Sequence, residues 1–403
     1  MPSFLQQLVC ASGEHFLGAD VAAGLCPECG RSLIAKYDLE SYRESHAPDS
    51  WSVGSTSIWR YFELLPLRRR ENIVTLGEGG SPVLSLEPPP EANGIRLSLK
   101  DDGILPTGSF KARGMSVAVS RALEGGRTSL FVPSAGNAGV ALAAYGARGR
   151  AKVRVYLPRS TPAPLQAAIS EFGAELVKVS GTIADAGRVG RLRESGTDSF
   201  DLSTLREPFR VEGKKTMGFE IFEQATGAQL PEVIVFPTGG GTGVLGLEKA
   251  FDELRSLGWL ERIPKLVAVQ AEHCAPIVRA FRDGDQEARP WKSPTTIAPG
   301  LLVPSPFDSA RVLTALRRTR GAAVTVTDRA IFTARAALAA KYGISVSPEG
   351  AAPFASLPKL IRDRIAHPGE HVLLYSTGTG RFSAKSLVSG SRRTVSSNRL
   401  ARK

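Results

Sequence analysis

The sequence contains no run of eighteen apolar residues, so it contains no candidate for a membrane-spanning helix. The N-terminus lacks the basic segment of a secretory signal, and Glu14 and Asp20 interrupt the stretch where an apolar core would lie. The sequence also contains no nucleic-acid-binding motif and no internal repeat. The 403 residues are 42% hydrophobic and 22% charged, which is typical of a soluble globular protein. We therefore predict a cytoplasmic protein with two domains and an appendage, which binds neither membrane nor nucleic acid.

Acidic residues are missing from the last part of the chain. Residues 383 to 403 contain six basic side chains and no carboxylate, which is half of the net charge of +12. The segment is rich in serine and has few apolar side chains to bury. We predict that residues 383 to 403 form a basic, disordered tail and not a binding arm.

Cysteine is scarce, and three of the four cysteines lie near the N-terminus. Cys26-Pro-Glu-Cys29-Gly is a knuckle of the kind that binds zinc, and Cys10 precedes it at a plausible distance. A complete ribbon needs a second thiolate near position 13, which is Gly13 here, so His15 is the candidate fourth ligand. Residues 1 to 45 therefore resemble a degenerate zinc ribbon. Either Cys10, Cys26 and Cys29 still bind zinc, or the ribbon has lost its metal.

The segment from Lys100 to Gly114 reads KDDGILPTGSFKARG, and Lys111 opens a helical pattern in it. A lysine at the start of a helix lies at the positive end of the helix dipole, which favours the neutral, nucleophilic amine. Neutral amines form Schiff bases with aldehydes, and pyridoxal phosphate is the usual aldehyde in proteins. The alternative is a solvated lysine in a first helical turn, so the surrounding segments must decide.

Strands and helices alternate along most of the chain, which predicts parallel sheets with right-handed crossovers. Two α/β sheets are expected, with Lys111 at their junction, and such sheets bind ligands beyond the carboxyl ends of the strands. We expect strands at 33–37, 96–100, 129–133, 153–157, 175–179, 200–202, 233–236, 266–269, 324–326 and 372–375, and helices at 114–123, 138–148, 164–172, 185–194, 215–225, 244–257, 328–341 and 351–364.

Three turns at strand ends carry chemistry. Pro237 to Gly243 reads PTGGGTG, and its backbone N–H groups, with the following helix, suit a phosphate. Ser134 to Ala138 reads SAGNA and offers N–H groups to a carboxylate, with a helix cap by Ser134 as the alternative. Tyr375 to Gly380 reads YSTGTG and follows the last predicted strand.

Together these segments resemble the threonine synthase family of the fold type II (β-family) pyridoxal-phosphate enzymes. PTGSFK at 106–111, LGEGGSP at 76–82 and the three turns carry the resemblance, which covers nearly all of residues 1 to 385. It implies two doubly wound α/β domains with the cofactor between them, as in tryptophan synthase β, and a small zinc-ribbon-like appendage. Residues 46–112 and 215–382 would form the large cofactor-binding domain, and residues 113–214 the small substrate-loop domain.

The resemblance also implies roles for individual residues. Lys111 would hold pyridoxal phosphate as a Schiff base and then act as the base at the α-carbon. The implied cofactor-binding residues are Lys111, Phe110, Asn137, Gly239, Gly240, Gly241, Thr242, Gly243 and Thr377, and the implied substrate-binding residues are Ser134, Ala135, Gly136, Ala138 and Arg210.

The substrate is less well determined. The family segment similar to N-S-x-N-P-x-R-x-E-G-Q-K-T reads TLREPFRVEGKKT at 204–216, so Arg210 is kept and the Asn-Ser pair is missing. Ala135 and Ala112 also replace residues common in threonine synthases. Three enzyme readings follow: a threonine synthase converting O-phosphohomoserine and water to threonine and phosphate, a cysteate synthase-like β-replacement or β-elimination on O-phosphoserine or another activated amino acid, and a serine/threonine dehydratase.

Two further alternatives concern partners. The chain could be a non-enzymatic anion-binding module, although such a module would have little reason to keep Lys111, Asn137 and Thr377 together. An aromatic-rich arm between residues 46 and 75 is expected to pack on its own domain or on a second subunit of a homodimer. The expected partner is otherwise a small amino-acid substrate.

Overall fold

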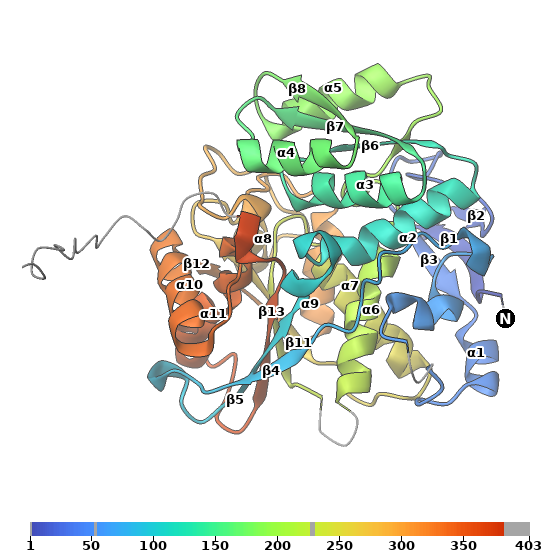
Figure 1. Ribbon diagram of the computed structural model, residues 1–403. Helices are drawn as coiled ribbons and strands as arrows, with labels where there is room; N and C mark the ends of the chain where they lie inside the picture. The colour runs from blue at the N-terminus through green and yellow to red at the C-terminus, as the bar shows by residue number, and fades with distance from the viewer. Residues whose placement is uncertain (1, 52–54, 226–229, 383–403) are drawn as a thin grey trace, which may run out of the picture.

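The computed structural model describes residues 2–51, 55–225 and 230–382 (Figure 1), so the predicted basic tail lies outside the described residues. The N-terminal appendage is an antiparallel sheet in the order β2-β1-β3, followed by α1 (Leu39–Ser45). Its strands are β1 (Leu5–Cys10), β2 (Phe16–Gly18) and β3 (Leu33–Tyr37). Of these elements the sequence had predicted β3. In the described part of the chain, no helix has both the length and the apolar character needed to cross a membrane.

The larger sheet has six strands in the order β12-β11-β10-β13-β5-β4. All neighbours are parallel except the edge strand β4, which runs antiparallel to β5. The central strands are apolar runs such as VIVFP because helices cover both faces of the sheet. The strands are β4 (Val83–Leu86), β5 (Arg96–Asp101), β10 (Val233–Pro237), β11 (Lys265–Ala271), β12 (Ala322–Val326) and β13 (His371–Ser376). The helices of this part are α6 (Phe209–Gln224), α7 (Thr242–Ser256), α8 (Pro276–Asp283), α9 (Ser309–Arg318), α10 (Asp328–Tyr342) and α11 (Pro348–Arg362).

The smaller sheet has four parallel strands in the order β8-β7-β6-β9 and lies at the top of Figure 1. Its strands are β6 (Ser129–Pro133), β7 (Lys152–Pro158), β8 (Glu175–Val179) and β9 (Phe200–Asp201), and its helices are α3 (Asn137–Arg148), α4 (Ala163–Glu171) and α5 (Ile183–Glu194). Helix α2 (Lys111–Glu124) leads from the larger sheet into the smaller one. The predicted two α/β sheets with Lys111 at their junction are confirmed.

Short 3₁₀ helices connect these elements: η1 (Ile58–Leu64), η2 (Arg70–Asn72), η3 (Pro90–Ala92), η4 (Asp102–Ile104), η5 (Pro106–Gly108), η6 (Pro299–Leu301) and η7 (Gly380–Phe382). The aromatic arm that contains η1 packs on its own chain. The Trp51 ring lies 5.2 Å from that of Phe219 and 5.5 Å from that of Trp259, and Tyr61 lies 5.3 Å from Phe219. The arm therefore adds to the same apolar core as α6. Trp51, Tyr61 and Phe219 are buried within this chain, and Trp259 is partly buried against them.

Helices α2 and α6 cross with their backbones almost in contact. A Cβ on Gly213 would overlap the carbonyl oxygen of Arg113, and one on Gly114 would lie 2.9 Å from the carbonyl oxygen of Arg210. Beside this crossing, the buried Arg113 guanidinium makes ion pairs of 2.8 Å with Asp102 and with Glu220. These contacts fix the start of α6 beside the start of α2.

One predicted boundary was wrong in a way that concerns the site. The sequence predicted a helix from residue 215, but α6 begins at Phe209. The preceding Pro208 already has helical backbone angles, and the Glu207 carboxylate accepts a 2.9 Å hydrogen bond from the Arg210 backbone N–H. This cap supports the first turn of α6, so Arg210 is a helical residue and not a loop residue.

Candidate active site

Lys111 is the first residue of α2 and keeps part of its side chain accessible. Its Nζ lies 3.9 Å from the centre of the Phe110 ring. Burial in these surroundings, and then the positive charge of Arg210, lower the pKa of Lys111 to about 7, while Glu349 opposes the shift. A substantial fraction of the amine is therefore neutral and nucleophilic near neutral pH.

The turn after β13 is bonded directly to the lysine segment. The Phe110 N–H donates to the carbonyl oxygen of Thr377 at 3.1 Å, and the Thr379 N–H donates to that of Gly108 at 2.9 Å. A Cβ on Gly378 would lie 3.3 Å from Nδ2 of Asn137. The structure thus brings the predicted Thr377 and Asn137 to the same place as the lysine segment.

The glycine-rich turn links β10 to the first residue of α7, Thr242. Gly241 has a φ of 87°, a conformation that glycine adopts without strain. A Cβ on Gly239 would overlap the carbonyl oxygen of Gly300, and one on Gly240 would lie 3.0 Å from Cγ2 of Thr204. The close surroundings of the turn therefore leave no room for larger residues, and its N–H groups stand at the positive end of α7.

The turn after β6 leads into α3, whose first residue is Asn137. The Ser134 hydroxyl accepts hydrogen bonds from the N–H groups of Gly139 at 3.0 Å and of Gly136 at 3.3 Å. The Ser134 hydroxyl therefore occupies two N–H groups of this turn, although the N-cap residue of α3 is Gly136. Ala135, Gly136 and Ala138 are half-buried at the same turn.

Arg210 lies on α6 and is 2% exposed. One of its terminal nitrogens, Nη1, donates to the carbonyl oxygen of Leu202 at 2.7 Å, while its buried Nε has no partner among the described residues. The nearby Glu207 is also buried, and this burial raises the pKa of its carboxyl to about 7 against the opposing charge of Arg210. A buried donor without a partner is costly, so Nε of Arg210 is available to an acceptor from a ligand.

Sequence reasoning missed Lys214 and Glu207. Lys214 stands four residues after Arg210 on the same face of α6, and its side chain is completely buried. The available signal was the departure from the family segment, which has Gln at the position of Lys214.

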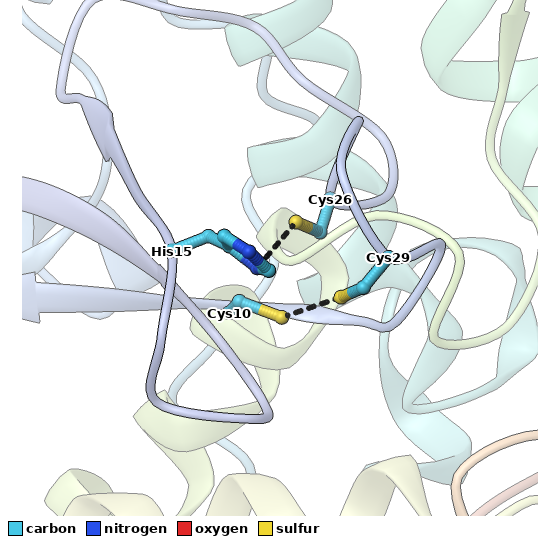
Figure 2. A group of neighbouring side chains, drawn as sticks. All are labelled: Cys10, His15, Cys26 and Cys29. Atoms are coloured by element: carbon cyan, nitrogen blue, oxygen red, sulfur yellow. Dashed lines mark hydrogen bonds between the residues drawn. The ribbon is translucent and has the colours of Figure 1, made fainter.

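The cysteines near the N-terminus converge with a histidine, as Figure 2 shows. The ligand atoms of Cys10, His15, Cys26 and Cys29 all lie within 4.8 Å of one another. Sγ of Cys10 is 3.1 Å from Sγ of Cys29, and Sγ of Cys26 is 3.6 Å from Nδ1 of His15. Three thiols and an imidazole at these separations match a tetrahedral metal site, so His15 occupies the place predicted for the fourth ligand.

Comparison with known proteins decides the family. The family model for pyridoxal-phosphate dependent enzymes matches residues 74–378. The chain belongs to this family. It is also 35% identical to the threonine synthase of Methanocaldococcus jannaschii, over 88% of this chain and 87% of that protein. A threonine synthase of Mycobacterium tuberculosis is 31% identical over 79% of this chain and 86% of its own length. The predicted resemblance to threonine synthases is confirmed.

Solved structures agree on the fold type of this pyridoxal-phosphate enzyme. Maize serine racemase matches with a TM-score of 0.65 at 20% identity, covering 74% of this chain and 88% of that chain. A threonine deaminase from T.th. matches with a TM-score of 0.61 at 27% identity, covering 72% of this chain and 88% of that chain. The predicted fold type II architecture is therefore confirmed.

Proposed function

We propose that this enzyme is a threonine synthase-like lyase that converts O-phosphohomoserine and water to threonine and phosphate, with pyridoxal phosphate held on Lys111. The observation that carries the proposal is the position of Lys111. Its amine, with a pKa of about 7, lies 3.9 Å from the centre of the Phe110 ring, and the Phe110 N–H donates to the carbonyl oxygen of Thr377. Nζ of Lys214, which donates to Thr242 beside the glycine-rich turn, lies 5.2 Å from the centre of the same ring. Threonine synthases among its relatives support the same activity.

The residues around Lys111 fit the cofactor. Gly239 to Gly243 offer N–H groups and the N-terminus of α7 to its phosphate. The Phe110 ring would flank the cofactor, Asn137 would donate to the phenolic oxygen, and the Thr377 hydroxyl would bond to the pyridine nitrogen. The buried Ser109 hydroxyl has no partner among the described residues, as expected where a ligand group supplies one.

Lys111 would move the proton. When bound, pyridoxal phosphate stabilises negative charge that develops at the α-carbon of an amino acid. The Lys111 amine would accept the proton from that carbon and return one later in the reaction. A hydroxyl such as that of Thr377 carries no charge with which to hold a pyridinium proton, which suits eliminations and replacements.

The substrate would be held by its anionic groups. The turn from Ser134 to Ala138 would bind the α-carboxylate through N–H groups, with Ala135 and Gly136 contacting it. The free Nε of Arg210 would bind a second anion, such as the phosphate of O-phosphohomoserine.

A second candidate is β-elimination or β-replacement on O-phosphoserine or a similar amino acid. The structural likeness to a threonine deaminase at 27% identity favours it, as do the departures at Thr204 and Ala135. Loss of hydrogen bonds to one substrate group can change specificity by orders of magnitude, so the substrate must be tested directly.

The test is to incubate the purified protein separately with O-phosphohomoserine and with O-phosphoserine, and to identify the products by mass spectrometry. Threonine from the first substrate supports the main proposal, whereas phosphate release from the second alone supports the alternative. A Lys111→Ala variant should lose the absorbance band of lysine-bound pyridoxal phosphate. If the wild-type protein shows no such band after reconstitution, the assignment of Lys111 is wrong.

We also propose that Cys10, His15, Cys26 and Cys29 hold one zinc ion. The support is the convergence of the four ligand atoms. Elemental analysis of the reduced, zinc-supplied protein should give one zinc per chain, and a Cys26→Ser variant should give much less. Equal, background-level zinc in both proteins would contradict the site.

The division into domains follows the sheets. We propose that residues 1–45 form the ribbon, that 46–112 and 215–382 form the large domain, and that 113–214 form the small one. The six-stranded and four-stranded sheets support this division. The homodimer and the cytoplasmic location stay predictions from the sequence.

A further inference from the structure

Lys214 is a buried amine without a counter-ion in the described part of the chain. Its side chain has no exposed surface, and its Nζ donates a 2.7 Å hydrogen bond to the Thr242 hydroxyl. The adjacent Lys215 is equally buried, but it makes ion pairs of 2.8 Å with Glu212 and 2.9 Å with Glu253. Burial of a charge is costly unless the charge is paired, so Lys215 has a structural explanation and Lys214 lacks one.

The groups nearest to Lys214 are mostly cations as well. Its Nζ lies 5.2 Å from the centre of the Phe110 ring, and Nζ of Lys111 lies 3.9 Å from the same ring. Burial and then the charges of Arg210 and Lys111 lower the pKa of Lys214 well below its usual value, opposed by Glu207. Arg210 and Lys111 thus outnumber Glu207 among the charged groups that act on Lys214, an arrangement that an anionic ligand would stabilise.

The hydrogen bond to Thr242 shows which part of the site Lys214 faces. Thr242 begins α7, immediately after the glycines of the turn that follows β10. The N-terminus of a 15-residue helix carries partial positive charge and repels an ammonium group. The structure nevertheless brings Nζ of Lys214 to the N-terminus of α7. An anion bound to both groups would be attracted by the amine and by the helix N-terminus.

We propose that Lys214 is the counter-ion of the cofactor phosphate, which it would bind together with the Thr242 hydroxyl and the N–H groups of Gly239 to Gly243. This inference rests on the proposed placement of that phosphate at the glycine-rich turn. It adds a charged side chain to a cradle otherwise built from backbone groups. It also means that the cofactor-free protein buries the Lys214 amine without a counter-ion, so cofactor binding and stability are coupled.

The test compares pyridoxal phosphate with pyridoxal, which lacks the phosphate, in the full-length protein. Affinities come from absorbance titrations of the cofactor-free wild type and of Lys214→Met and Lys214→Gln. Loss of a charge-assisted contact should weaken pyridoxal phosphate binding about 10- to 100-fold. Binding of pyridoxal should change less than about 2-fold, because the lost contact is to the phosphate.

Thermal unfolding of the cofactor-free proteins supplies a second readout. Lys214→Met replaces a buried amine that has no counter-ion with an apolar side chain, so this variant should unfold at or above the wild-type temperature. Lys215→Met is the matched control: it breaks ion pairs and should unfold at a lower temperature while it keeps the wild-type preference for pyridoxal phosphate over pyridoxal.

The outcomes separate this inference from the proposed function. Equal weakening of both cofactors in Lys214→Met, or no weakening of either, would overturn it. A raised KM for the amino-acid substrate with an unchanged cofactor preference would also overturn it, because Lys214 would then face the substrate. If the wild type binds neither cofactor, it is the proposed function that fails.

Discussion

The close crossing of α2 and α6 predicts that a side chain at Gly213 lowers the stability of the protein. A Gly213→Ala substitution places a Cβ that overlaps the carbonyl oxygen of Arg113 and lies 2.8 Å from Cα of Gly114. Both obstacles are backbone atoms of α2, so no side chain can rotate away to make room. The two helices must separate, and Arg210 and Lys214 on α6 then move away from Lys111 on α2.

Two opposing effects set the change in the free energy of unfolding for Gly213→Ala. Alanine in place of a helical glycine stabilises a helix by about 1 kcal/mol. Against this, a carbon atom prefers to lie about 3.3 Å or more from a carbonyl oxygen, and the new Cβ would lie 2.2 Å from that of Arg113. The helices must therefore part by roughly 1 Å, which weakens many contacts between them. Overpacking of this kind costs about 1–3 kcal/mol, and the upper end applies because backbone meets backbone. We expect a net destabilisation of about 2 kcal/mol.

The assay compares Gly213→Ala with Gly187→Ala on α5. A Cβ on Gly187 would meet nearest, at 3.2 Å, a terminal nitrogen of the flexible Arg191 side chain, so this control should show the helix-forming gain alone. Thermal unfolding should move down for Gly213→Ala and stay level or move up for Gly187→Ala. Pyridoxal phosphate affinity should fall for Gly213→Ala only. The reasoning is refuted if Gly213→Ala is as stable as the control and binds the cofactor with wild-type affinity.

Three further predictions concern charge and metal. The rate of cofactor capture by the cofactor-free protein, followed by stopped-flow absorbance, should rise with pH through about 7 as Lys111 loses its proton. Arg210→Met should move this midpoint to higher pH, because a neighbouring positive charge is lost; an unmoved midpoint would contradict the assigned cause. Arg113→Met removes the cation paired with Asp102 and leaves Glu220 to Lys100 and Arg60, and should cost about 3 kcal/mol in urea unfolding, whereas unchanged stability would mean that the ion pairs contribute nothing. A zinc chelator should lower the unfolding temperature of the wild type, reversibly on zinc addition, and leave a Cys26→Ser variant unaffected; equal shifts in both proteins would argue against the metal site.

Much of the fold could be predicted because its signals are local. Apolar strands such as the one ending at residue 237 alternate with helices, and glycine-rich turns follow them, so both sheets and the place of Lys111 were evident. The start of α6 was not predicted, because Pro208, Gly213 and adjacent lysines suggest a loop. Gly213 is glycine because α2 passes within contact distance, and this reason depends on a residue 100 positions away in the sequence, Arg113.

Some residues of the candidate site could likewise be predicted from the sequence, and others could not. Lys111, Asn137 and Thr377 lie in turns that a sequence pattern can identify. Lys214 differs from Lys215 only through its partners, since one meets a hydroxyl and the other meets two carboxylates. These partners come from α7 and from α6 itself, so the distinction appears only after the helices are packed.

The docking of the ribbon on α6 and α7 sets a lower limit on how far this enzyme can be shortened. The Tyr37 hydroxyl donates to Glu212 at 2.9 Å, and the Lys249 ammonium donates to the carbonyl oxygen of Ala35 at 2.7 Å. Removing every residue before position 74 would expose the ion pairs of Glu212 and Lys215 to water and would also remove Trp59, which donates to Glu78. We therefore expect residues 74–378, the region that matches the family, to be less stable when produced alone, and engineering of this enzyme should start from a chain that keeps the ribbon and the arm.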